Sequence, residues 1–165
     1  MGEESFIYGS SIGRRRQEQL QRFVNGVLSD GKPRGKAHLL SNIPFPIFQD
    51  SRRRGVNLKS DHIFISDKAV LKYVSHPKSA KGATLPFKEF WKTANIASQP
   101  KNIYIDSKRK NLVYVFASRG AKGKSIKMVV EPNYKYGKQR VNMVTSIGVV
   151  DKRAFKNHSQ YRKIK

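Results

Sequence analysis

The sequence contains no cysteine and few acidic residues, and both shortages limit its chemistry. Without cysteine, the chain has no disulfides, thiolate metal sites or cysteine nucleophiles. Apart from Glu3-Glu4, its 11 acidic residues are scattered singly, without the clustered carboxylates of Mg²⁺-dependent nucleases, and its four histidines lack the spacing of a metal motif. We therefore expect an activity that uses neither a metal nor another cofactor.

Long apolar runs are also missing. None approaches the roughly 20 residues that a membrane-spanning helix needs, and the N-terminus lacks the basic and apolar regions of a signal peptide. No basic amphipathic helix with a large apolar face is evident, so we expect no membrane partner. Hydrophobic residues make up 38% of the 165 positions, which is enough for one modest core.

Positive charge is what the chain has in excess. It carries 34 lysine and arginine residues against 11 acidic ones, a formal net charge of +23. Of these, 23 basic and six acidic residues follow position 60, so the excess extends over the predicted folded part. A polyanionic partner is indicated, because cations that neutralise phosphates release counterions. A basic surface that serves only solubility is the alternative.

Four runs of β-branched and aromatic residues predict an antiparallel meander. They are Ile103–Asp106, Leu112–Ser118, Ile126–Glu131 and Val141–Ile147. In the third run, alternate residues from Ile126 to Val130 are apolar, and the opposite face carries Lys127, Val129 and Glu131. We expect the apolar face to join the core and the other face to be a working surface.

Residues 1–57 are predicted to form an N-terminal extension to a domain of residues 58–165. An amphipathic helix should begin at Arg14 and end at Asp30-Gly31. Its apolar face is formed by Leu20, Phe23, Val24, Val27 and Leu28. Residues 32–59 are rich in proline, glycine and arginine, which favours a linker or an irregular arm, with Ile43–Phe48 apolar enough to dock.

The predicted domain begins with a short strand and two helices. The strand is His62–Ser66, and Ser66 should cap a helix from Asp67 to about Ser75. A second helix, from about Leu85 to Ala97, is expected to be the main core helix. The order of elements predicts an α+β fold, in which N-terminal helices pack on one face of a four- to five-stranded antiparallel sheet and leave the other face for a ligand.

The residue types that remain after these exclusions are His, Arg, Lys, Ser, Thr and Tyr. They suffice for metal-independent RNA cleavage, in which the 2′-hydroxyl attacks the adjacent phosphate and leaves a 2′,3′-cyclic phosphate. A base removes the hydroxyl proton, an acid protonates the leaving oxygen, and cations stabilise the phosphorane. Histidine suits the base or acid role because it titrates near neutral pH.

The succession of elements resembles the barnase/EndoU/colicin/RelE-like nucleases, and most closely their phage-associated branch of C-terminal toxin domains. The resemblance extends over about residues 58–165, from the strand at His62 and the helix ending at His76 to the three runs between Leu112 and Ser146. It implies a metal-independent ribonuclease with its site on the exposed face of the sheet.

The resemblance also implies catalytic positions at the end of the first helix, on a middle strand and on a late strand. The matching residues are His76 as acid or base, Lys127 with Arg119 as cations, and Ser146 or Thr145 to orient the phosphate. Because neighbouring strand residues point to opposite faces, only one of the last two should line the site. Thr145 shares its side with apolar residues, which favours Ser146.

Further residues are predicted to bind RNA around this site. Lys122 and Lys124 lie with Arg119 in a basic hairpin tip suited to phosphate contacts. Additional candidates are Arg140, Tyr134, Tyr136 and Tyr161, the tyrosines as platforms for base stacking or, alternatively, as packing residues. No glutamate or second histidine matches the family pattern, and His158 is the alternative for that second acid or base.

A toxin domain of this kind implies RNA, such as tRNA, as substrate and an acidic immunity or antitoxin protein as inhibitor. It would act in the cytoplasm of a target cell, after secretion or delivery as part of a larger protein or phage particle. The competing interpretation is a non-catalytic module that binds RNA or DNA, either ribosome-associated or phage-structural. A binding module should lose affinity gradually when any lysine or arginine is removed. A nuclease should lose turnover sharply at one histidine or one cation while binding persists.

Overall fold

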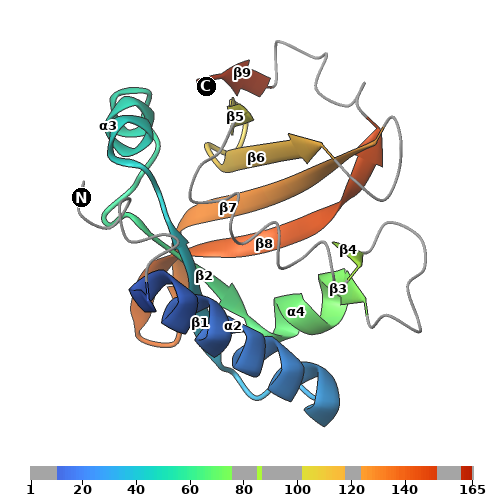
Figure 1. Cartoon of the computed structure of the whole chain (residues 1–165). Coiled ribbons are helices and arrows are strands. Elements are labelled where there is room, and N and C mark those ends of the chain that lie inside the picture. The colour runs from blue at the N-terminus through green and yellow to red at the C-terminus, as the bar shows by residue number, and fades with distance from the viewer. Residues whose placement is uncertain (1–10, 76–84, 87–101, 118–123, 152–160, 165) are drawn as a thin grey trace.

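The computed structural model describes residues 11–75, 85–86, 102–117, 124–151 and 161–164 (Figure 1). Within these ranges the fold is mixed α and β. The helices are α2 (Ser11–Asp30), α3 (Phe45–Arg53) and α4 (Asp67–Tyr73). The strands are β1 (Ala37–Asn42), β2 (His62–Ser66), β3 (Val74–Ser75), β4 (Leu85–Pro86), β5 (Asn102–Asp106), β6 (Leu112–Ala117), β7 (Lys124–Tyr136), β8 (Gln139–Asp151) and β9 (Tyr161–Lys163).

Seven of these strands form one sheet, in the order β1-β2-β8-β7-β6-β5-β9. The predicted meander is confirmed as the antiparallel run β5 to β8. The expected four- to five-stranded antiparallel sheet is wrong, because β2 pairs in parallel with β8, β1 pairs with β2, and β9 pairs with β5. Three of the seven strands thus come from segments outside the meander.

The hairpin of β7 and β8 is longer than predicted. Each strand has 13 residues, and pairing continues through the expected turn to Tyr136 and Gln139. Gly137 has a left-handed φ of 61°, which glycine adopts without the steric cost of a side chain. The turn is therefore confined to Gly137 and Lys138.

Residues 32–59, which were expected to form a linker or an irregular arm, contain β1 and α3. Pro44 is the residue at the N-cap of α3, and a second proline follows in the first turn, where the missing amide costs no hydrogen bond. The prolines thus mark the start of a helix. Ile43 and Ile47 are buried in the same core as side chains from the strands after position 57.

Two predicted helix ends are confirmed: the C-terminus of α2 and the N-terminus of α4. A third, the start of a helix at Leu85, is wrong. Helix α2 ends at Asp30, where Gly31 is left-handed and its amide donates to the carbonyl of Val27 at 2.9 Å. The Ser66 side chain caps α4 by accepting from the amide of Ala69 at 3.1 Å. The helix predicted from Leu85 is wrong at its start, because Leu85–Pro86 pairs as a strand with β3. The rest of that helix lies outside the described residues.

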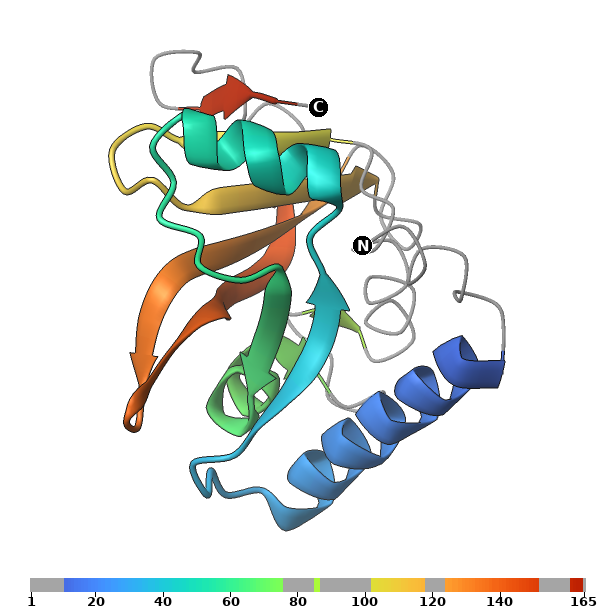
Figure 2. The ribbon, with the colours of Figure 1, turned by 90° about the vertical axis from the view of Figure 1, so that its left-hand side faces the viewer.

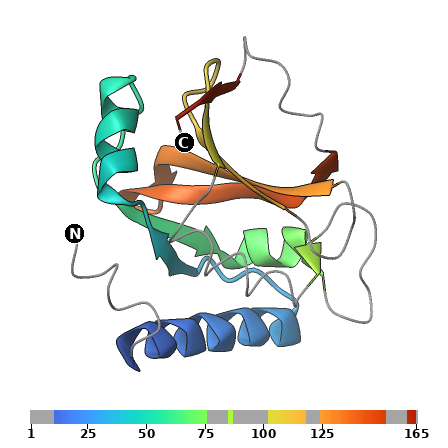
Figure 3. The same cartoon turned by 45° about the horizontal axis from the view of Figure 1, so that its top comes forward.

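The main apolar core lies against one face of the sheet, and all three described helices contribute to it. The predicted alternation in β7 is confirmed, with Ile126, Met128 and Val130 buried in this core. Helix α2 lies beside α4 and β1, whereas α3 stands apart from both, so the helices do not form one layer (Figures 2 and 3). Among the described helices, none is long and apolar enough to cross a membrane.

Candidate functional site

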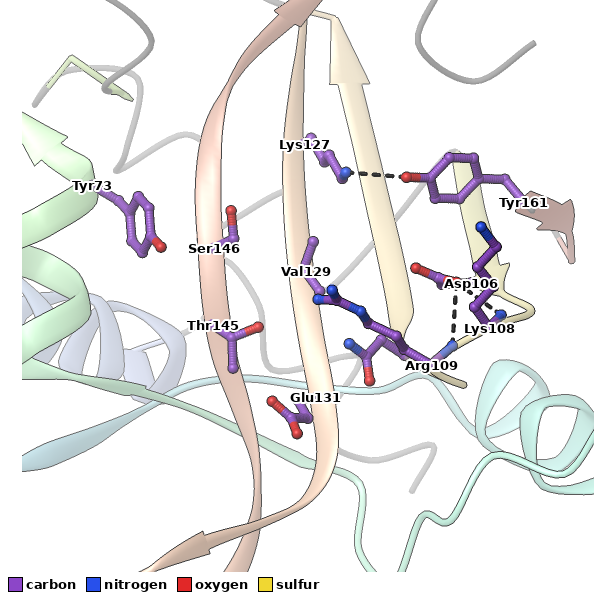
Figure 4. Close-up of a pocket in the computed structure, with 11 residues that line it drawn as sticks. Tyr73, Asp106, Lys108, Arg109, Lys127, Val129, Glu131, Thr145, Ser146 and Tyr161 are labelled. Carbon is purple, nitrogen blue, oxygen red and sulfur yellow. Dashed lines mark hydrogen bonds between the residues drawn. The ribbon is translucent and has the colours of Figure 1, made fainter. Parts of the chain in front are cut away.

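A pocket of about 940 Å³ opens on the sheet face opposite the main core (Figure 4). Five segments supply its lining: the end of α4, the turn between β5 and β6 with its flanking residues, β7, β8 and β9. The lining residues are Tyr73, Asp106, Lys108, Arg109, Asn111, Lys127, Val129, Glu131, Thr145, Ser146 and Tyr161. The pocket therefore contains three of the five residues predicted to be catalytic.

Strand β7 places Lys127, Val129 and Glu131 in the pocket, because they alternate with its core residues. Val129 pairs with Ser146 on β8, so these two side chains share the same face. Regular strands with one face fixed in a packed core hold such residues in defined directions. The predicted core face of β7 is therefore confirmed, and the opposite face lines the pocket.

The hydroxyls of Thr145 and Ser146 both line the pocket, contrary to the expectation that only one could. The reason is a β-bulge: Val129 pairs with Ser146, but the next residue, Val130, pairs with Val144. Thr145 is the extra residue between these pairs, so strict alternation fails there. Val144 keeps its place in the core, and Thr145 can turn to the same side as Ser146.

Lys127 contacts Tyr161 of β9 across the pocket. Its Nζ donates a hydrogen bond to the Tyr161 hydroxyl at 3.3 Å, and the same nitrogen lies 5.4 Å from the centroid of the tyrosine ring (Figure 4). The ring also packs against the small apolar cluster of Val113 and Val115 on this face. The lysine ammonium thus lies in the pocket with one hydrogen-bond partner among the described residues.

The turn between β5 and β6 presents two more cations. Asp106 is buried, and its carboxylate accepts from the backbone amides of Lys108 at 3.0 Å and Arg109 at 3.3 Å. Lys110 takes a left-handed φ of 59°, and its amide donates to the Asp106 carbonyl at 2.7 Å. The Asp106 carboxylate therefore organises the turn, and the side chains of Lys108 and Arg109 are left to line the pocket.

Glu131 supplies the remaining carboxylate of the pocket. In the described part of the chain its carboxylate has no hydrogen-bond or ion-pair partner, and the side chain lines the pocket. No family pattern identified this residue. The available signal was the strand alternation, which already places Glu131 on the same face as Lys127. Arg109 and Tyr73 gave no such signal, because only folding brings them to this face.

Three predicted RNA-binding residues lie elsewhere, near the closed end of the β7–β8 hairpin. Arg140 donates to the carbonyl of Asn133 at 3.3 Å. Tyr134 pairs with Val141 in the ladder, and the hydroxyl of Tyr136 is buried without a hydrogen-bond partner among the described residues. Desolvation, and secondarily the charge of Asp67, raises the pKa of Tyr136. None of the three lines the pocket.

The remaining predicted positions have no described side chain. His76, Arg119, Lys122 and His158 lie outside the described residues. Lys124 is the first residue of β7, but only its backbone is described. Their functional roles stay predictions.

No cluster of three or more histidine or acidic residues that could hold a metal occurs in the described ranges. Comparisons with protein-family models, with curated proteins and with solved structures found no match for this chain.

Proposed function

We propose that this pocket cleaves RNA without a metal, by attack of the 2′-hydroxyl on its adjacent phosphate. The observation that carries the proposal is the convergence of Lys127, Glu131 and the paired hydroxyls of Thr145 and Ser146 in one open pocket. Phosphoryl transfer uses groups of these kinds: a carboxylate to accept a proton, and a cation and hydroxyls to stabilise the developing charge. The net charge of +23 supports a polyanionic substrate.

Lys127 and Arg109 are the cations that would stabilise the phosphorane. They reach the pocket from opposite sides, one from β7 and one from the β5–β6 turn (Figure 4). The hydroxyls of Thr145 and Ser146 can donate to the non-bridging phosphate oxygens. Groups fixed on strands lose little energy to reorganisation when charge develops, which is why one such donor is worth about 10²–10³ in rate.

Proton transfer needs two further groups. Glu131 would remove the proton from the attacking 2′-hydroxyl, a role supported by its position in the same pocket as the cations. The acid that protonates the leaving 5′-oxygen is assigned to His76, the histidine suggested by the family resemblance. Arg119 is proposed as a further cation on the same evidence.

The family resemblance supports three finer proposals, on the fold, the inhibitor and the place of action. The β5–β8 meander is the counterpart of the antiparallel sheet in barnase-like nucleases, with the pocket on its exposed face. An acidic immunity or antitoxin protein would inhibit the enzyme by covering the pocket rim at Lys108 and Arg109. The enzyme would act in the cytoplasm of a target cell.

The test is incubation of the purified chain with total tRNA and with a long single-stranded RNA in excess EDTA. We expect discrete fragments that end in 2′,3′-cyclic phosphate. The same sequences with 2′-O-methyl riboses should stay intact, because the nucleophile is blocked. Cleavage of the methylated strands, or the absence of cleavage at every enzyme concentration, would refute the proposal.

The second candidate function is a module that binds nucleic acid without cleaving it. One separate observation favours it: several exposed cations lie outside the pocket. Arg52 and Arg53 end α3, and Lys135, Lys138 and Arg140 lie exposed near the hairpin turn. Surface cations of this kind contribute additively to non-specific affinity. A pure binder would lose affinity gradually at any of them and would show no position where turnover alone collapses.

A further inference from the structure

Tyr161 reaches the pocket from the last strand in the described chain. Strand β9 has three residues and pairs only with the outer edge of β5, where Asp106 is opposite Tyr161 and Tyr104 is opposite Lys163. One residue later, the amide of Ile164 donates to the carbonyl of Ile103 at 2.8 Å. These ladder bonds fix the backbone of Tyr161 beside the pocket.

The position of its hydroxyl is fixed by two further contacts. The ring packs against Val113 and Val115, and the hydroxyl accepts from Lys127 at 3.3 Å. The ammonium nitrogen is 3.3 Å from the hydroxyl oxygen and 5.4 Å from the ring centroid, so it lies nearer to the hydroxyl than to the centre of the ring. The hydrogen bond, more than the ring, therefore defines where the ammonium sits.

Lysine needs such a partner more than arginine does. Its ammonium is a compact charge on a flexible four-carbon stem, and its three donors rotate freely. One hydrogen bond to a fixed hydroxyl selects one place for the charge and leaves two N–H donors for phosphate oxygens. In the described part of the chain, the Tyr161 hydroxyl is the only hydrogen-bond partner of the Lys127 ammonium.

We propose that Tyr161 is a positioning residue, which holds the Lys127 ammonium in the pocket through its hydroxyl. A segment 34 residues further along the chain thereby completes the site. The catalytic consequence rests on the proposed function, but the positioning itself does not, and the two can be tested separately.

The first test measures the lysine directly. Full-length wild type, Tyr161→Phe, Tyr161→Ala and the neighbouring surface variant Arg162→Ala are treated with limiting acetic anhydride, and acetylation at each lysine is followed by mass spectrometry. Lys127 should react about three- to tenfold faster in both Tyr161 variants, as the loss of a hydrogen bond of ordinary strength implies. Lys108, in the same pocket, should react equally in all four proteins, and Arg162→Ala should match wild type.

Two results of this test would overturn the proposal. Equal labelling of Lys127 in wild type and both Tyr161 variants would show that the hydroxyl does not hold it. Labelling that changes in Tyr161→Ala but not in Tyr161→Phe would assign the effect to the ring. Tyr161→Phe keeps the ring against Val113 and Val115, so a failure of Tyr161→Ala to fold leaves the test intact.

The second test measures the consequence for RNA cleavage. Tyr161→Phe should lower kcat about tenfold and change KM less than about twofold, because a misplaced cation loses transition-state contacts while surface charge is unchanged. An unchanged kcat would refute the catalytic consequence. If wild type does not cleave RNA but Lys127 labelling responds to Tyr161→Phe, the proposed function fails and the positioning role stands.

Discussion

Met128 and Lys127 are neighbours on β7, yet they belong to different environments. Met128 is fully buried and packs in the main core with residues from the helices and from β6 and β8. Lys127 projects to the opposite face, where its described partner is the hydroxyl of Tyr161 at the edge of an open pocket. The comparison teaches that one strand can separate stability from the proposed chemistry. The even-numbered residues of β7 from 126 to 130 pack in the core, and the odd-numbered residues from 127 to 131 line the pocket.

The largest expected effect is a loss of stability on the core face. Met128→Ala should lower the free energy of unfolding by about 2–5 kcal/mol, because it removes a fully buried side chain and leaves a cavity. Val129→Ala, on the half-buried pocket face, should cost no more than about 1.5 kcal/mol. Urea unfolding of the two variants measures this difference. Equal losses would mean that the two faces are not distinct in packing.

The opposite pattern is expected for the pocket face. Lys127→Ala should lower kcat for RNA cleavage about 10²–10³-fold, because it removes a cation from the transition state. Its free energy of unfolding should fall by no more than about 1.5 kcal/mol, since the side chain is not part of the core and loses only its hydrogen bond to Tyr161. Lys135→Ala, on the same strand but outside the pocket, is the matched control and should keep its turnover. Equal activity in Lys127→Ala and Lys135→Ala would show that Lys127 has no catalytic role.

A somewhat smaller effect is expected for the pocket carboxylate. Glu131→Gln keeps the shape of the side chain and should reduce kcat by about 10²-fold, the lower end of what a positioned general base contributes. Glu18→Gln, on the exposed side of α2, controls for the change in net charge. Single-turnover cleavage at saturating enzyme separates this loss from a change in RNA affinity. Faster cleavage by Glu131→Gln would show that its charge only repels the substrate.

The smallest effect concerns Tyr114, another residue of the core face. Its hydroxyl is buried with no hydrogen-bond partner among the described residues, and burial raises the pKa of its phenol. Above about pH 10, where an unfolded tyrosine ionises, the unfolded state releases this proton and the folded state does not. Stability must therefore fall as pH rises through this range.

Tyr114→Phe removes both the unpaired hydroxyl and the titrating group. We expect it to raise the free energy of unfolding at pH 7 by about 1 kcal/mol and to make the alkaline decline shallower by up to about 1.4 kcal/mol per pH unit. Tyr134→Phe, in the hairpin, is the control and should do neither. Urea unfolding between pH 7 and 11 measures both effects. A steeper decline in Tyr114→Phe would contradict the assignment.

Local pattern was sufficient to predict the separation of the two faces. The apolar alternation in β7 and the Ser66 cap of α4 are properties of a few consecutive residues, and both are confirmed. Lys127 was therefore assigned to the correct face. By contrast, the prediction of an irregular arm for residues 32–59 was wrong. Proline composition alone does not distinguish a loop from the first turn of a helix such as α3.

The rest of the site depends on pairing that no local pattern encodes. Thr145 faces the pocket because a bulge inserts one residue opposite β7, and a bulge depends on the register between two strands. Tyr161 and Arg109 reach the pocket only after β9 and β5 join the sheet. Glu131 is the exception, because the strand alternation alone places it on the same face as Lys127. It was not predicted as a site residue because no glutamate matches the family pattern.

The most direct test of the pocket as a catalytic site compares cleavage with binding in Lys127→Ala. Single-turnover cleavage of one end-labelled RNA in excess EDTA is measured for wild type and the variant, together with the Kd for a 2′-O-methyl version of that RNA. We expect wild type to produce 2′,3′-cyclic phosphate ends and Lys127→Ala to cleave about 10²–10³-fold more slowly, with a Kd changed only severalfold. Equal cleavage rates, or a loss of rate that is fully explained by lost binding, would contradict the assignment of catalysis to this pocket.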